Sequence, residues 1–145
     1  MPPTSSAILS LPIHQHIGLS LQSQTPQPTS IALVTFTTKA TLLTPNATLH
    51  GGITQIALDA SCYLALIPLL RENESGATIA SNFQMIGAVT GEGKVVEIEA
   101  KVLKRGKNLA FCLAEAKSEG RLVAIAMVTK TIVSALTPGN VKSKL

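Results

Sequence analysis

Hydrophobic and polar positions follow the two-residue period of β-strands in the second half of the chain. Apolar residues at even positions from Val96 to Val102 alternate with charged residues at odd positions, which predicts a strand with one buried face and one exposed face. The extended segments expected on this basis are 77–87, 95–105, 108–117 and 121–133. Glycine-containing turns separate them, so we expect antiparallel hairpins. Segments 109–114 and 122–128 are apolar on both faces, which indicates central strands with two-sided burial. One face can cover the apolar helix, and the other can pack against another subunit or a helix of it.

The first half of the chain carries the helical signal. A loop rich in Pro, Thr and Asn precedes an apolar segment from about 52 to 70, and this pattern predicts one long helix that breaks near Pro68. The segment approaches the length of a membrane span, but its polar residues favour a buried core helix, so no membrane span is expected. Before it we expect a short helix near 7–11, a polar turn at 22–29 and a strand at 31–39. The predicted fold class is α+β.

Length and composition fit one compact domain. The chain has 145 residues, of which 46% are apolar and 14% charged, and it contains no Trp. We expect a single domain over residues 1–136 and a flexible tail over 137–145. The apolar surplus is larger than a small domain can cover, which indicates a buried interface between subunits.

Charged residues are concentrated in the second half of the chain. Apart from Lys39 and Asp59, every Lys, Arg, Asp and Glu lies at position 71 or beyond, and the net charge is +4. The basic side chains of Lys104, Arg105 and Lys107 could contact nucleic acid, an anionic membrane or the phosphates of a nucleotide-bearing substrate. No aromatic residues are interleaved with them, which argues against nucleic acid. A solvated hairpin tip is the simpler alternative.

The cysteines give no sign of a metal or redox site. Cys62 and Cys112 lie fifty residues apart in apolar surroundings, without CxxC spacing and without a cluster of His or carboxylate residues. We therefore expect two buried free thiols, no metal and no cofactor.

Asp59 is the most informative single residue, because it is the only acidic residue in the first 71 positions and lies within an apolar helix. A carboxylate in such surroundings is costly unless it is paired, and it is a candidate general base or nucleophile. The alternative is a solvated or capping Asp. His50-Gly51-Gly52 opens the same helix, and glycine there exposes backbone N–H groups to an oxygen anion such as that of a thioester transition state.

The spacing of Gly51 and Asp59 has a consequence for assembly. The two residues are eight positions apart, which is roughly 12 Å along a helix. One substrate carbon cannot contact both. If both act on the same thioester, the amide and the carboxylate come from different subunits, so the site would lie across a symmetric dimer interface.

The sequence ends in Ser143-Lys144-Leu145, the tripeptide that the peroxisomal import receptor reads. Residues 138–140, Pro-Gly-Asn, precede it and favour an exposed tail. We expect localisation in the peroxisomal matrix, where acyl-CoA esters are abundant.

Together these segments resemble the hotdog-fold acyl-CoA thioesterases, specifically the phenylacetate-type group and its animal relatives. The resemblance covers residues 11–133 and rests on Leu11-Pro12 with His16-Ile17-Gly18, Leu49-His50-Gly51-Gly52, Leu58-Asp59, the hairpin 100–108, and Gly120-Arg121-Leu122-Val123-Ala124. It implies a long central helix wrapped by an antiparallel β-sheet, an acyl-CoA substrate, and a homodimer or a homotetramer formed as a dimer of dimers.

The resemblance also implies roles for individual residues. Asp59 would be the base or nucleophile, the Gly51 amide would hold the carbonyl oxygen, and Thr78 would position water. His50 would support the loop or the leaving thiolate. Gly52 would belong to the substrate-binding amide turn, and Lys104, Arg105 and Lys107 would meet CoA phosphates. His14 and His16 are expected to be packing or surface residues.

The sequence departs from the family in the loop before His50. Position 44 is Thr where the family commonly has Asn, and position 47 is Ala where it usually has Gly. Asn46 is a substitute candidate for the contact on the thiolate side.

Two alternatives to an acyl-CoA thioesterase stay open. One is a hotdog enzyme that releases a product in a secondary-metabolite pathway, and the other is a non-catalytic acyl-CoA-binding hotdog protein. A hydratase is disfavoured because no His follows Asp59 on the helix.

Overall fold

The computed structural model describes residues 2–26 and 29–134. The predicted targeting residues Ser143, Lys144 and Leu145 lie outside the described residues. The helices are α1 (Ser5–Leu9), α2 (Pro12–Ile17) and α3 (Gly51–Leu66), with the short 3₁₀ helices η1 (Ala40–Leu42) and η2 (Ile67–Leu69). The strands are β1 (Ser20–Thr25), β2 (Ile31–Thr37), β3 (Glu74–Met85), β4 (Val95–Arg105), β5 (Leu109–Ser118) and β6 (Arg121–Ser134).

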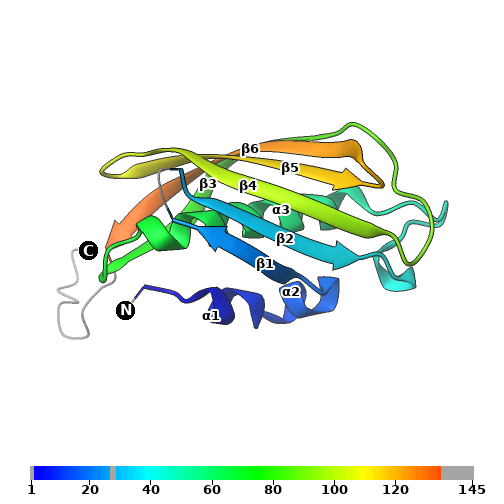
Figure 1. Ribbon diagram of the computed structural model, residues 1–145, viewed down its shortest axis with the longest axis horizontal. Helices are drawn as coiled ribbons and strands as arrows, with labels where there is room; N and C mark the ends of the chain where they lie inside the picture. The colour runs from blue at the N-terminus through cyan, green and yellow to red at the C-terminus, as the bar shows by residue number, and fades with distance from the viewer. Residues whose placement is uncertain (1, 27–28, 135–145) are drawn as a thin grey trace, which may run out of the picture.

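The described strands form one six-stranded antiparallel sheet in the order β1-β2-β4-β5-β6-β3. Helix α3 contacts all six strands, and the sheet curves along it (Figure 1). The N-terminal helices α1 and α2 contact each other, and both contact α3. The predicted α+β architecture, with one long helix against an antiparallel sheet, is confirmed.

The core lies between α3 and the sheet. Leu58, Cys62 and Leu64 of α3 are fully buried, and they meet strand residues such as Ile98 and Val128. The segment Gly51–Leu69 is long and apolar enough to cross a membrane, but half of it is buried inside the protein. A core helix meets the same criteria, so its composition reflects burial against the sheet.

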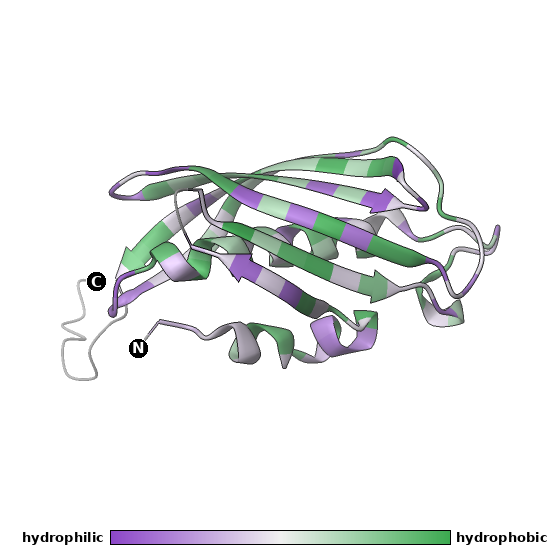
Figure 2. Cartoon of the chain, viewed as in Figure 1, coloured by the Kyte–Doolittle hydropathy of each residue, from purple (hydrophilic) through white to green (hydrophobic). Residues whose placement is uncertain are grey.

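Strand β4 has the predicted alternation. Its even-numbered residues Val96, Ile98, Ala100 and Val102 are buried. Hydrophobic and hydrophilic residues accordingly alternate along the ribbon of β4 (Figure 2). Within the described chain β5 and β6 are buried on one face only, and burial of the second face against another subunit stays a prediction. Phe111 and Met127 are 37% and 44% exposed, because only one face of the sheet meets α3.

The predicted polar turn at 22–29 needs correction. The segment 22–29 was expected to be a polar turn, but its first half belongs to β1, which pairs with β2. Its polar residues suit this position because β1 is an edge strand whose side chains are mostly exposed. The Gln22 amide also donates a hydrogen bond to Thr35 Oγ1 on β2 (3.0 Å).

The hairpin prediction holds for two of its three turns. Strands β4 and β5 and strands β5 and β6 form antiparallel hairpins. The turn at 90–94 does not join a hairpin, since β4 pairs with β2, whereas β3 pairs with β6 at the opposite edge of the sheet. Local turn residues alone do not distinguish a hairpin from a connection that crosses the sheet.

Candidate active site

The N-terminus of α3 presents backbone N–H groups. His50 is the N-cap residue, and its Nδ1 accepts a hydrogen bond from the Gly52 N–H (3.0 Å). Among the described residues the Gly51 N–H has no hydrogen-bond acceptor. The structure therefore leaves the Gly51 amide free for a ligand oxygen and uses the Gly52 amide for the cap.

The loop before α3 is held by its own contacts. Thr44 Oγ1 and Thr48 Oγ1 share a hydrogen bond (2.8 Å), and Asn46 lies exposed between them in sequence. Ala47 has a φ of 58°, a left-handed conformation that favours glycine. Ala47 therefore holds a backbone conformation that costs free energy for any residue with a Cβ. Asn46 makes no side-chain hydrogen bond within the described residues.

Asp59 lies on the face of α3 that meets β3 and β6. Its Oδ1 accepts hydrogen bonds from Thr78 Oγ1 of β3 (2.7 Å) and from Lys130 Nζ of β6 (3.1 Å). Lys130 Nζ also donates to Thr78 Oγ1 (2.7 Å). The Asp59 side chain is 38% exposed, and no described residue contacts its Oδ2 by a hydrogen bond. The carboxylate is thus anchored through one oxygen and open through the other.

Lys130 is a site residue that the sequence reasoning missed. It is 1% exposed, and its ammonium lies 5.2 Å from the centre of the Tyr63 ring. The available signal was the alternation along β6, in which Lys130 shares the helix-facing positions with Ala124, Ala126 and Val128. A charged residue at such a position needs a partner, and Asp59 is the carboxylate that supplies one.

A β-bulge adjusts the geometry of Thr78. Thr78 pairs with Lys130 in the β3–β6 register, and the register shifts between Thr78 and Ala80. Ile79, between them, is 58% exposed. Bulges commonly redirect side chains at functional sites. Here the Thr78 hydroxyl lies within hydrogen-bond distance of both ionic groups.

Two hollows meet at Asp59. One, of about 260 Å³, follows the face of α3 from Gly52 through Gln55 and Ile56 to Asp59 and Thr78. The other, of about 460 Å³, continues past Asp59 between the N-terminal segment and β3, where Ile8, Leu11 and Tyr63 contribute apolar surface. The structure thus brings Gly52, Asp59 and Thr78 to one concave surface.

His14 borders both hollows, although the sequence indicated only a packing or surface role. Its Nδ1 lies 2.7 Å from the Ile8 carbonyl oxygen. Because a carbonyl only accepts, Nδ1 carries the proton and Nε2 is the acceptor nitrogen of the neutral ring. His14 therefore combines a packing contact with a position beside the carboxylate.

The basic side chains of the hairpin between β4 and β5 are of two kinds, exposed lysines and one arginine in an ion pair. Lys104 and Lys107 are exposed. Arg105 forms an ion pair with Glu74 and donates a further hydrogen bond to the Gly106 carbonyl (2.9 Å). The hydrogen bond from Arg105, followed by that from the Arg71 backbone N–H, lowers the pKa of Glu74. Arg105 is therefore held as a structural ion pair, which leaves the two lysines as the exposed cations of this hairpin.

Both cysteines are buried free thiols, as expected. The hydrogen bond with Cys112, reinforced by burial, raises the pKa of Cys62 well above its ordinary value. Such a thiol stays protonated and inert at neutral pH. Within the described residues no group of His, Cys, Asp and Glu has the arrangement of a metal site.

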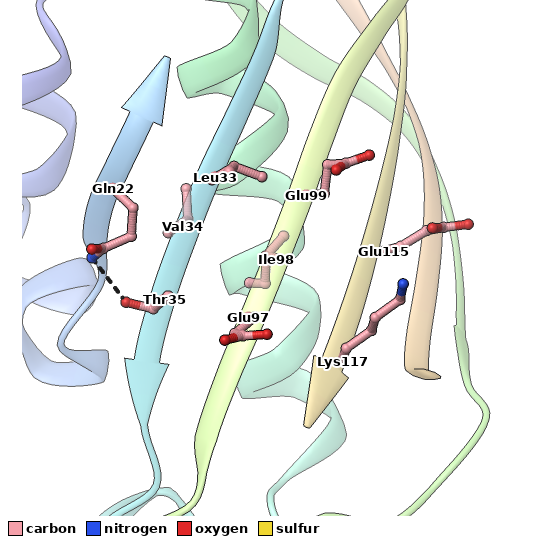
Figure 3. A pocket seen from close by; sticks show the side chains of 9 residues that line it. All are labelled: Gln22, Leu33, Val34, Thr35, Glu97, Ile98, Glu99, Glu115 and Lys117. Carbon is pink, nitrogen blue, oxygen red and sulfur yellow. Dashed lines mark hydrogen bonds between the residues drawn. The ribbon is translucent and has the colours of Figure 1, made fainter. Parts of the chain in front are cut away.

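A further hollow, of about 370 Å³, lies on the outer face of the sheet (Figure 3). Glu97, Glu99, Glu115 and Lys117 line it, and Glu99 lies directly opposite Glu115 in the β4–β5 register. Three carboxylates against one ammonium repel an anionic ligand. None of the predicted site residues contributes to it.

Comparison with known proteins places the fold. No protein-family model and no curated protein matches the chain at the level of sequence. The structure is similar to a thioesterase from Haemophilus influenzae, with a TM-score of 0.80, 16% identity, and coverage of 91% of this chain and 90% of that one.

Two further solved structures are similar. A phenylacetic acid degradation-related protein from Ralstonia eutropha has a TM-score of 0.77 at 19% identity, covering 89% of this chain and 99% of that one. A hypothetical thioesterase protein from Streptococcus pneumoniae, solved with coenzyme A, has a TM-score of 0.73 at 18% identity, covering 83% and 89%. The chain therefore has the hotdog fold that these thioesterase structures share.

Proposed function

We propose that the protein is an acyl-CoA thioesterase of the phenylacetate-type hotdog group, which hydrolyses an acyl-CoA to a free acid and CoA. The observation that carries the proposal is the open carboxylate of Asp59, anchored through Oδ1 beside Thr78 at the meeting point of two hollows. The similar structures include thioesterases and a protein solved with coenzyme A. These neighbours support the substrate class.

The geometry favours a general-base mechanism. Oδ2 of Asp59 is free to accept a proton from water, and the water oxygen then forms a bond to the thioester carbon. Thr78 donates its own proton to Asp59, so its oxygen positions this water by accepting a hydrogen bond. The carbonyl oxygen gains negative charge that the Gly51 N–H stabilises. Collapse of the intermediate breaks the C–S bond and releases CoA thiolate, which takes up a proton.

His50 has a defined place in this scheme. Its Nδ1 accepts the Gly52 N–H, so in the neutral ring Nε2 carries the proton. A proton on Nε2 suits donation to the leaving thiolate, and the cap also fixes the loop. Asn46, on the exposed part of the loop before α3, is the proposed second contact to the leaving thiolate. Lys104 and Lys107 are the proposed contacts to CoA phosphates.

The acyl-binding alternative shares the fold and the hollows. It differs in one respect, because a binder needs no base. The anchored carboxylate with one open oxygen favours catalysis over binding alone. A product-releasing enzyme of a secondary-metabolite pathway would use the same site chemistry on another thioester.

Thiol release from a panel of acyl-CoA esters tests the function. The panel contains short, long and aromatic acyl groups, and free thiol is measured with a chromogenic disulfide. We expect enzyme-dependent release that saturates with at least one ester. If calorimetry detects binding of these esters but no thiol appears with any of them, the binding role replaces the catalytic one.

We further propose a homodimer formed through β3, either alone or within a tetramer. In the described chain β3 is an edge strand of 12 residues that pairs only with β6. Ile79 and Met85 are exposed along it, and Ile86 is exposed just after its end. A long exposed edge of this kind is suited to pairing with a second strand.

Such a dimer would bring the two halves of the site together. If β3 pairs with its copy about positions 81 and 82, Thr78 of one protomer lies opposite Met85 of the partner subunit. Met85 lies against Gly51 within each chain, since a Cβ on Gly51 would be 3.6 Å from Met85 Cγ. The Gly51 amide of one protomer then faces the Asp59 region of its partner.

Mixed dimers test this shared site. One inactive chain carries Asp59→Asn, and the other carries Gly51→Pro, which removes the Gly51 N–H. If each site takes one residue from each protomer, a heterodimer contains one intact site of two, and an equimolar mixture refolded together regains about a quarter of wild-type activity. No recovery beyond the sum of the two variants would place both residues of a site in the same chain.

Localisation in the peroxisomal matrix stays a prediction that rests on Ser143-Lys144-Leu145. The proposed partners are accordingly an acyl-CoA substrate, a second copy of the chain and the peroxisomal import receptor.

A further inference from the structure

Lys130 is the most deeply buried charge in the described chain, and the mechanism above does not use it. Burial of an ammonium group costs free energy, and a pair of apolar side chains often replaces a buried ion pair without loss of stability. An ordinary packing role therefore does not account for lysine at this position. Its hydrogen bonds point to the neighbouring functional groups, Asp59 and Thr78.

We propose that Lys130 is a positioning residue that sets the direction of the Thr78 hydroxyl and selects Oδ2 of Asp59 as the proton acceptor. This inference rests on the proposed function. An ammonium only donates hydrogen bonds, so Thr78 Oγ1 must accept from Lys130. The Thr78 proton is then directed to Asp59 Oδ1, at 2.7 Å.

The Lys130 ammonium also contacts the Asp59 carboxylate from the buried side, at Oδ1. Oδ1 receives hydrogen bonds from both Lys130 and Thr78, whereas Oδ2 receives none from the described residues. Without Lys130, the Thr78 hydroxyl could turn its proton toward the water oxygen and donate a hydrogen bond to the lone pair that must attack the thioester carbon. Lys130 thus converts a rotatable hydroxyl into a fixed acceptor.

Lys130 is itself held in place from behind. The Tyr63 ring lies 5.2 Å from its ammonium. The Tyr63 hydroxyl shares a hydrogen bond with Ser75 Oγ (3.0 Å) and accepts one from the Gly76 N–H (3.1 Å), so the ring is tied to β3. Lys130 is 1% exposed and lines the larger hollow at its back, with its ammonium hydrogen-bonded to Asp59 and Thr78. We therefore expect it to act through these two side chains.

The test compares kcat and KM for the wild type, Lys130→Met and Lys130→Gln. Met fills the space without donating, and Gln donates without the charge. We expect Lys130→Met to lower kcat about 100-fold and Lys130→Gln about tenfold, because a charge-assisted hydrogen bond is lost or weakened. KM should change less than about twofold, since Lys130 is 1% exposed and donates its hydrogen bonds to Asp59 and Thr78. Lys117→Met, on the outer face (Figure 3), is the matched control and should retain wild-type kinetics.

A double-mutant cycle with Thr78→Val identifies the route of the effect. If Lys130 acts through the hydroxyl, Lys130→Met should lower kcat less in the Thr78→Val background than in the wild type. Equal effects in both backgrounds would overturn the inference, as would wild-type kcat in Lys130→Met.

Folding and function are separated within the same experiment. Lys130→Met should fold, because Asp59 is 38% exposed and stays in contact with water without its counter-charge, and circular dichroism checks this. If it does not fold, Lys130→Gln decides alone, and a kcat equal to the wild type overturns the inference. A wild type that releases no thiol from any ester overturns the proposed function, and the inference falls with it.

Discussion

Replacing Asp59 with Asn is expected to lower kcat for thioester hydrolysis by about 10² to 10⁴-fold, the usual contribution of a general base. The substitution keeps the shape of the side chain and its hydrogen bonds from Thr78 and Lys130, but the amide cannot take a proton from water. Acyl-CoA affinity should be retained. Steady-state thiol release and calorimetric binding measure the two quantities separately.

Stability must be controlled in this variant. Asp59→Asn leaves the buried ammonium of Lys130 without its counter-charge, which we expect to lower the free energy of unfolding by about 2 kcal/mol. This value lies below that of a fully buried pair because Asp59 is 38% exposed. The double variant Asp59→Asn/Lys130→Met removes the unpaired charge and should recover stability without recovering activity. A single variant with normal kcat and raised KM would mean that Asp59 binds substrate and does not act as the base.

Replacing Gly51 with Pro is expected to lower kcat by about 10² to 10³-fold through loss of one oxyanion donor. Gly51 is the first residue of α3, the position at which proline fits a helix and its missing N–H breaks no helical hydrogen bond. His50 already has the extended conformation that a residue before proline requires (φ −65°, ψ 127°). Kinetic comparison with the wild type measures the loss.

Gly51→Ala is the matched control for this prediction. It keeps the N–H, and its Cβ would meet only Met85 Cγ at 3.6 Å, an ordinary contact. We expect near-normal kcat in Gly51→Ala. Equal losses in the two variants would show that the space at Gly51 matters and the amide does not.

Much of the fold follows from periodicity. The bounds of β4 were predictable because its buried face dictates an alternating pattern. The position of the central helix was predictable because a long apolar segment follows a polar loop and ends near Pro68. Strand β1 was missed because its side chains are mostly polar and exposed, so it carries no such pattern. The pairing of β3 with β6 was missed because it depends on a long connection across the sheet and not on a local turn.

The candidate site was predictable where composition was unusual. Asp59 stood out as a lone carboxylate in an apolar helix, and Thr78 was placed through the family resemblance. Lys130 was hidden, because its pairing with Thr78 depends on the β3–β6 register. The ion pair between Arg105 and Glu74 could not be predicted either, since Glu74 belongs to a strand that is distant in sequence. A pattern along the sequence does not contain the contacts between strands that are distant in sequence.

The most direct test of thioester hydrolysis is a single turnover with the wild-type protein in excess over one bound acyl-CoA, in which free CoA and free acid are both quantified. We expect one equivalent of each product per acyl-CoA, formed at a rate that Asp59→Asn lowers by about 10² to 10⁴-fold. Recovery of the bound acyl-CoA intact would contradict the catalytic account and leave a binding protein.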